Sequence, residues 1–237
     1  MTILNRTTLE VMGTVVSLAT PAPDVQDMCV VVREVLVAAD RRFSPFRPDS
    51  ELCRLRRDSQ AAAAMGEDMR EVLTECLSLQ QRTDGAFRPT NRRGQVDTTG
   101  YVKGWAMAQA EQALRERGWT TWNLGVGGDV VVAGHNGDRP WHVAVRHPAL
   151  RGAVAEVLAV SDAAVATSGE YERGGHIWGG AHQPRDGSVT VVGPRIEIAD
   201  ALATALWASS DPAPRWLRGF PEYGVLRLGA AGQRLAV

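Results

Sequence analysis

The chain has 237 residues, of which 44% are hydrophobic and 22% charged, a composition typical of soluble globular proteins. Its 26 Lys and Arg residues nearly balance 27 Asp and Glu residues, so the formal charge of -1 gives no general attraction to nucleic acid or to an anionic membrane. No apolar stretch is long enough to cross a bilayer, and the first residues lack the basic start and apolar run of a signal peptide. Cys29, Cys53 and Cys76 have no CxxC spacing and leave one thiol unpaired in any scheme, which predicts reduced thiols and a cytoplasmic location.

The elements predicted in the first half are mostly helical. Residues 8–20 read as a strand pair, or as one bent strand, around Met12-Gly13-Thr14. The spacing of apolar residues then predicts helices over 25–42, over a short stretch from Glu51, over 67–82 and over 100–117. Pro45 and Pro48 exclude a helix between residue 42 and Glu51. Gly85 is a natural end for the helix over 67–82.

The second half mixes strands and helices irregularly. Strands are predicted over 121–133 (broken by Gly125, Gly127 and Gly128), 141–146, 153–166, 188–192 and 223–228, and helices over 198–209 and 213–218. Thr167-Ser168-Gly169 reads as a turn. Without a regular βαβ repeat or a linker, the pattern predicts an α+β fold, with residues 1–237 forming one domain of mixed β-sheets packed with helices.

The stretch VDTTGYVKG, which starts at Val96, allows two interpretations. Asp97 can simply cap a helix while Lys103 faces solvent, and spacing alone favours this interpretation. Alternatively, the free N–H groups and the dipole of the helix start attract an anion, and Lys103 in its first turn adds positive charge. A ligand that carries phosphate would suit the second interpretation.

Two further stretches also allow two interpretations each. The glycines of NLGVGGDVVVAG, which starts at Asn123, mark either a bulge or a close approach of the backbone to a cofactor. Asp200 and Thr204 lie four residues apart on one helical face, so they are either an ordinary cap and core residue or two oxygen ligands for a hard cation such as Mg²⁺. His176 follows a polar turn and is the best histidine for acid–base work, although its pattern alone favours an ordinary surface role.

Taken together, seven segments in order along the chain resemble the ApbE family of FAD:protein FMN transferases. The segments are MGTVVSL at Met12, FSPFRPDSELCRL at Phe43, TDGAFRPT at Thr83, VDTTGYVKGWAMAQA at Val96, NLGVGGDVVVAG at Asn123, VATSGEYERGGHIW at Val165 and SVTVVGPRIEIADALATALWA at Ser188. The resemblance implies an ApbE-like, T-fold-related domain. It also implies transfer of FMN from FAD, with Mg²⁺, to a Ser or Thr hydroxyl of an acceptor protein, with release of AMP.

The resemblance also implies roles for individual residues. The carbonyl of Gly100, together with Asp200 and Thr204, would bind the metal. His176 would accept the proton of the acceptor hydroxyl, and Asp97 would join it as a catalytic residue. The residues implied to contact FAD are Met12, Phe46, Gly85, Ala86, Phe87, Asp97, Lys103, Ser168 and Ile177.

Four features depart from the family pattern. Phe46 stands where Tyr is usual, and Arg88 replaces the aspartate of GAFDP. Gly179 replaces the aspartate that usually follows His-Ile, and the region between Thr90 and Val96 is short. Two other activities therefore remain alternatives: hydrolysis of FAD to FMN and AMP, and binding of FAD without catalysis.

Overall fold

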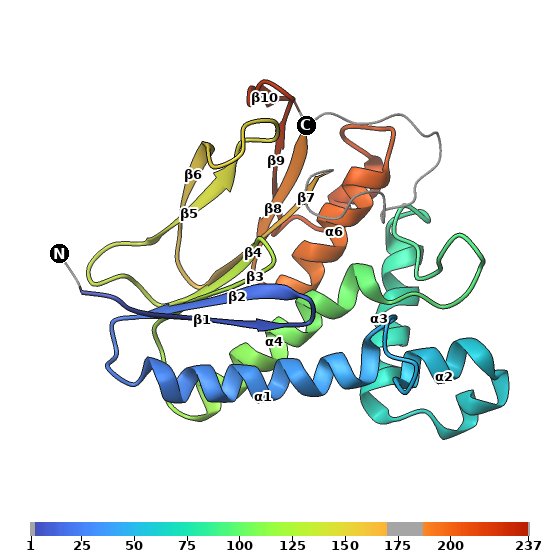
Figure 1. Cartoon of the computed structure of the whole chain (residues 1–237). Coiled ribbons are helices and arrows are strands. Elements are labelled where there is room, and N and C mark those ends of the chain that lie inside the picture. The colour runs from blue at the N-terminus through green and yellow to red at the C-terminus, as the bar shows by residue number, and fades with distance from the viewer. Residues whose placement is uncertain (1–2, 170–186, 237) are drawn as a thin grey trace.

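The computed structural model describes residues 3–169 and 187–236, except the side chains of 59–61, and shows an α+β architecture (Figure 1). Eight strands form one antiparallel sheet in the order β1-β2-β3-β4-β7-β8-β9-β10. Their bounds are β1 Asn5–Val11, β2 Thr14–Thr20, β3 Trp122–Val126, β4 Asp129–Ala133, β7 Ala163–Gly169, β8 Ser188–Gly193, β9 Gly224–Leu228 and β10 Arg234–Leu235. The predicted fold class is confirmed.

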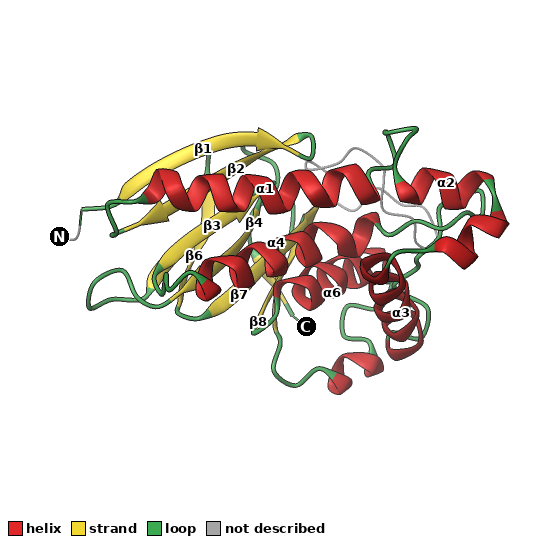
Figure 2. Ribbon diagram, turned by 90° about the horizontal axis from the view of Figure 1, so that it is seen from below, coloured by secondary structure: helices red, strands yellow, loops and turns green. Residues whose placement is uncertain are grey.

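Helices cover one face of this sheet. Figure 2 shows α1 (Val25–Phe43), α4 (Thr99–Glu116) and α6 (Ile196–Ala208) side by side across it. Helices α2 (Glu51–Arg57) and α3 (Glu67–Arg82) lie at one end of this layer, and the 3₁₀ segments are η1 (Ser59–Ala64) and η2 (Arg215–Gly219). A large apolar core, which includes Leu36, Met107, Leu124 and Leu202, fills the space between helices and sheet. None of the helices in the described residues is both long and apolar enough to cross a membrane.

A separate hairpin covers part of the other face. It consists of β5 (Trp141–Arg146) and β6 (Val154–Val160), which pair only with each other. Trp141 and Val143 from β5 pack with Val132 and Val165 of the large sheet in a small second core. The sheet therefore has a helical face and a hairpin face (Figure 1), and α4 and α6, which carry the predicted metal ligands, lie on the helical face.

Two tight turns meet at one end of the sheet. Met12 and Gly13 connect β1 to β2 with φ of 55° and 68°, and Gly127 and Gly128 connect β3 to β4 with φ of 55° and 96°. Positive φ at both central positions is the geometry of hairpins with two-residue loops. A Cβ on Gly127 would lie 2.9 Å from the hydroxyl oxygen of Thr14, so the two turns are in contact. This contact places Met12 next to the β3–β4 turn.

One sequence prediction is wrong here. Thr167-Ser168-Gly169 forms no turn but the last part of β7, opposite Thr190, Val189 and Ser188 of β8. The hydroxyls of Thr167 and Thr190 lie 2.9 Å apart in a cross-strand hydrogen bond. Small polar residues usually signal a turn, but here pairing inside a large sheet decides the conformation.

Candidate functional site

The centre of the site is a buried cluster of one ammonium group and two carboxylates. Lys103 Nζ of α4 lies 2.6 Å from Asp129 Oδ2 at the start of β4 and 3.6 Å from Asp200 Oδ1 of α6. The exposed fractions of the three residues are only 8%, 0% and 4%. Charges so well buried are tolerated only when they are paired or bind ions. The expectation that Lys103 faces solvent is therefore wrong.

A very close helix contact brings Lys103 and Asp200 together. The N–H of Gly104 donates to Asp200 Oδ2 at 3.2 Å. A Cβ on Gly104 would lie 2.5 Å from the Cα of Glu197 and 2.9 Å from the carbonyl oxygen of Ile196, so only glycine allows this approach of α4 to α6. The sequence Lys103-Gly104 thus combines the charge with the backbone contact that holds its partner.

Replacing Gly104 with alanine is expected to lower the free energy of unfolding by about 3 kcal/mol, because the methyl group meets main-chain atoms that cannot rotate away. Urea unfolding followed by circular dichroism measures the change. Gly219→Ala is the control, because no atom lies within 4 Å of its added Cβ, and we expect it to change stability by less than about 0.5 kcal/mol. Equal stability of the two variants would mean that the α4–α6 contact is looser than it appears.

Asp129 is the site residue that the sequence reasoning missed. Its side chain is fully buried, and its second oxygen, Oδ1, accepts the N–H of Thr167 at 3.0 Å. Burial raises the pKa of the Asp129 carboxyl to about 7, an effect that the Lys103 ammonium opposes and the Asp200 carboxylate reinforces. One sequence signal was available: Lys103 is the only lysine among 26 Lys and Arg residues. A single lysine implies a need for a compact ammonium group, and therefore for an acidic partner.

The three predicted metal ligands lie at the same α4–α6 contact. A Cβ on Gly100 would lie 3.5 Å from Cγ2 of Thr204, and Asp200 is one helical turn before Thr204. No group of three His, Cys, Asp or Glu side chains in the described residues has metal-binding geometry. The set of one carboxylate, one hydroxyl and one carbonyl nevertheless suits Mg²⁺ in donor type. The buried cluster also carries two carboxylates for one ammonium, which favours an additional cation.

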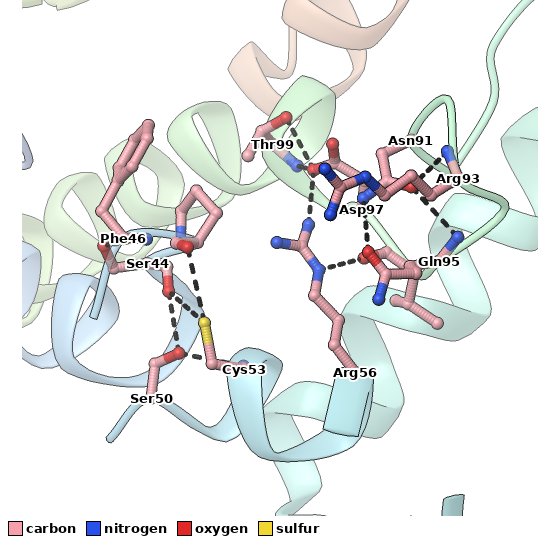
Figure 3. Close-up of polar contacts among 12 residues, drawn as sticks. Ser44, Phe46, Ser50, Cys53, Arg56, Asn91, Arg93, Gln95, Asp97 and Thr99 are labelled. Carbon is pink, nitrogen blue, oxygen red and sulfur yellow. Dashed lines mark hydrogen bonds and ion pairs between the residues drawn. The ribbon is translucent and has the colours of Figure 1, made fainter. Parts of the chain in front are cut away.

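Asp97 lies at the start of α4, beside Thr99 and Arg56 (Figure 3). Its Oδ1 accepts the N–H of Thr99 at 3.1 Å and the Thr99 hydroxyl at 2.8 Å, and lies 3.4 Å from Arg56 Nη2. Arg56 Nε also donates to the Val96 carbonyl at 2.7 Å. In this structure Asp97 therefore fixes the first turn of α4, as the simpler interpretation predicts, and its catalytic role stays a prediction.

The turn after α3 carries three predicted FAD contacts. Gly85 has a φ of 77°, which ends the helix, and its N–H donates to the Gln80 carbonyl at 2.8 Å. The N–H groups of Ala86 and Phe87 donate to the carbonyl and hydroxyl of Thr83 at 2.9 and 3.0 Å. Because all three N–H groups are already used, backbone contacts to FAD from this turn would come from carbonyl oxygens. The Phe87 side chain is buried and packs beside Gly100.

Phe46 is presented to solvent by a well-anchored loop. Its side chain is 84% exposed, whereas the surrounding loop is held by Ser50 Oγ donating to the Ser44 carbonyl at 2.8 Å and by Cys53 Sγ 3.4 Å from the Pro45 carbonyl. Figure 3 shows the ring pointing away from these contacts. An exposed aromatic ring on a fixed loop can stack on a flat ligand at little entropic cost.

Of the remaining predicted residues, Met12 is half-buried at the β1–β2 turn and packs against the main core. Ser168 is buried in β7, next to its last residue, Gly169. His176 and Ile177 lie outside the described residues. The structure thus brings Gly100, Lys103, Asp200 and Thr204 together and adds Asp129.

The fold and the site define an α+β protein with a buried lysine–carboxylate cluster where a helix start meets a second helix. The model of the ApbE family matches residues 12–94 and 90–225, nearly the whole chain. The chain therefore belongs to the ApbE family, and the resemblance suggested by its sequence is confirmed.

Individual relatives agree with this assignment. The chain is 35% identical over 166 residues to an FAD:protein FMN transferase of Rhodobacter capsulatus, a match that covers 65% of this chain and 32% of the relative. It is 31% identical over 130 residues to an FAD:protein FMN transferase of Vibrio cholerae, which covers 49% of this chain and 39% of that relative. These matches span only about a third of the length of either relative.

Solved structures show the same fold. The flavin transferase ApbE of Vibrio cholerae superimposes with a TM-score of 0.74 at 20% identity, covering 96% of this chain and 94% of that one. The ApbE protein of Thermotoga maritima gives a TM-score of 0.77 at 20% identity, covering 98% of this chain and 96% of that one.

Proposed function

We propose that this protein transfers FMN from FAD to a Ser or Thr hydroxyl of an acceptor protein, in a Mg²⁺-dependent reaction that releases AMP. Family membership and the names of its relatives support flavin transfer. The observation that carries the proposal is the buried cluster of Lys103, Asp129 and Asp200 beside the first turn of α4. It provides the charge arrangement that a diphosphate and a divalent cation require.

Transfer of a phosphoryl group depends on neutralising charge and aligning the reacting atoms. Mg²⁺ held by the Gly100 carbonyl, Asp200 and Thr204 would supply a Lewis acid for the diphosphate oxygens. Lys103 adds a positive charge at the helix start, where the α4 dipole also favours an anion. Asp97 contributes by holding this helix start through Thr99 and Arg56.

The acceptor hydroxyl must lose a proton as its oxygen attacks phosphorus. We assign this proton to His176, as the family resemblance implies. Histidine is the side chain most often used as a general base at neutral pH. Asp97 Oδ1 accepts two hydrogen bonds from Thr99, so this oxygen holds the start of α4.

The exposed Phe46 ring gives a prediction about FAD binding. Phe46→Ala should raise the KM for FAD about tenfold, the loss expected for one stacking contact, while leaving thermal stability unchanged because the ring touches so little of the protein. Steady-state kinetics with varied FAD measure it. Leu150→Ala, which removes another exposed apolar side chain, serves as control. An unchanged KM would remove Phe46 from the FAD site.

A direct test of the proposed function uses mass spectrometry. The protein is incubated with FAD, Mg²⁺ and an acceptor protein that carries a Ser/Thr flavinylation motif, and FMN adducts and AMP are both quantified. We expect one AMP per adduct and no adduct without Mg²⁺. AMP and free FMN in the absence of acceptor would instead show an FAD hydrolase, and bound FAD without any product would show a binding protein.

The cytoplasmic location stays a prediction. All three cysteines are free thiols, with Cys76 buried.

Burial raises the pKa of the Cys76 thiol to about 12, which makes it a packing residue rather than a nucleophile.

A further inference from the structure

Lys103 lies unequally between its two carboxylates. Its Nζ is 2.6 Å from Asp129 Oδ2, a close ion-pair contact, but 3.6 Å from Asp200 Oδ1, beyond hydrogen-bond range. We propose that Asp129 is a positioning residue: by holding the ammonium group of Lys103, it leaves the carboxylate of Asp200 available to a divalent cation. This inference rests on the proposed function, because it assigns the metal to Asp200.

Asp129 is well placed for this role because the sheet holds it rigidly. It is the first residue of β4, directly after the Gly127-Gly128 turn, and the Thr167 N–H from β7 fixes its Oδ1. Lys103 and Asp200, by contrast, belong to two helices that pack on each other. The Asp129–Lys103 contact therefore ties α4 to the sheet and draws the ammonium group away from α6.

The choice of residue at position 103 agrees with this geometry. The other 25 of the 26 Lys and Arg residues are all arginine. A planar guanidinium with five donors would spread over both carboxylates, whereas a compact ammonium group can be drawn to one of them. Lysine at this single position fits a site where one carboxylate must be neutralised and the other must not.

The expected consequence concerns Asp129→Asn. This change keeps the size of the side chain and an oxygen for the Thr167 N–H, but it removes the charge that attracts Lys103. Among the residues that the structure describes, Asp200 is then the remaining carboxylate beside Nζ, at 3.6 Å compared with 2.6 Å for Asp129. A Lys103–Asp200 ion pair closer than the 3.6 Å contact present here would neutralise the proposed metal ligand, so we expect the dissociation constant for Mg²⁺ to rise about tenfold or more.

The test measures Mg²⁺ binding by calorimetry on protein saturated with ADP, a diphosphate that cannot transfer FMN. In parallel, ¹⁵N-lysine labelling gives a single side-chain resonance, because Lys103 is the only lysine. We expect Asp129→Asn to weaken Mg²⁺ binding and to shift this resonance. Asp24→Asn, which alters a carboxylate hydrogen-bonded to Trp119 Nε1, should do neither.

The double variant Asp129→Asn/Lys103→Met removes the whole ion pair, a change that folded proteins often tolerate. We expect it to bind Mg²⁺ more tightly than Asp129→Asn alone, because no ammonium group then competes for Asp200. Mg²⁺ binding in the double variant that is no tighter than in Asp129→Asn, or unchanged binding in folded Asp129→Asn, would overturn the role of Asp129. If instead the wild type with ADP binds no Mg²⁺, the metal assignment in the proposed function fails.

Discussion

Asp200→Asn is expected to lower FMN transfer by about 10²–10³-fold, the loss typical of removing one group that stabilises developing charge. Asparagine retains an oxygen that can accept the Gly104 N–H, so the α4–α6 contact should survive. The lost property is the negative charge that we assign to Mg²⁺ binding. Initial rates of FMN attachment to an acceptor protein, measured with rising Mg²⁺, test this prediction.

The Asp200 measurement needs a control that removes charge without touching the site. Asp162→Asn is suitable, because Asp162 is an exposed carboxylate in the turn between β6 and β7. We expect wild-type rates for this variant and an unaltered melting temperature for both. If Asp200→Asn still flavinylates the acceptor at the wild-type Mg²⁺ optimum, Asp200 is not a metal ligand.

Lys103→Met should destabilise the protein by about 3–5 kcal/mol at neutral pH, since it leaves Asp129 buried without its cation. The effect depends on pH in a defined direction. The pKa of the Asp129 carboxyl is raised to about 7 in the folded protein, above its ordinary value of 3.8. As the pH rises, this carboxyl therefore loses its proton in the unfolded chain before it does so in the folded protein. The free energy of unfolding consequently falls as the pH rises toward 7. Without Lys103 this pKa rises further, and the fall continues to higher pH.

Urea unfolding of Lys103→Met at pH 5 and pH 9 measures this difference. We expect the variant to lose more stability at pH 9 than at pH 5. At pH 9 the buried Asp129 carboxyl is driven toward its charged form, and the Lys103 ammonium is no longer there to stabilise that charge. Arg115→Met, in the same helix, removes a half-exposed cation paired with Glu111 and should cost less than about 1 kcal/mol. An equal loss at both pH values would show that the Lys103 ammonium does not stabilise the Asp129 carboxylate.

The helices were predictable from the sequence because their apolar residues repeat with the helical period. The bounds of α1, α3, α4 and α6 differ from the predicted ones by at most two residues. Glycines also marked real chain reversals: Gly85 ends α3, and Gly127-Gly128 joins β3 to β4. Gly125, however, lies inside β3 beside Ser17, so it does not break the strand as predicted.

The site was only partly predictable. Asp200 and Thr204 could be paired from their four-residue spacing, which the helix preserves. Asp129 could not be assigned to the site from spacing, because its contacts with Lys103 and Thr167 join residues far apart in the sequence. The local sequence pattern also led to the wrong prediction that Lys103 is exposed, because a lysine in a helix usually is. Lys103 is buried because α6 approaches α4 closely at Gly104.

The most direct test is a crystal structure of the protein with ADP and Mn²⁺, an anomalous scatterer that replaces Mg²⁺. We expect one anomalous peak between the Gly100 carbonyl, the Asp200 carboxylate and the Thr204 hydroxyl, in contact with the diphosphate, while Lys103 remains on Asp129. A diphosphate bound away from the first turn of α4, or a metal peak with none of these three ligands, would contradict the proposed chemistry of the site.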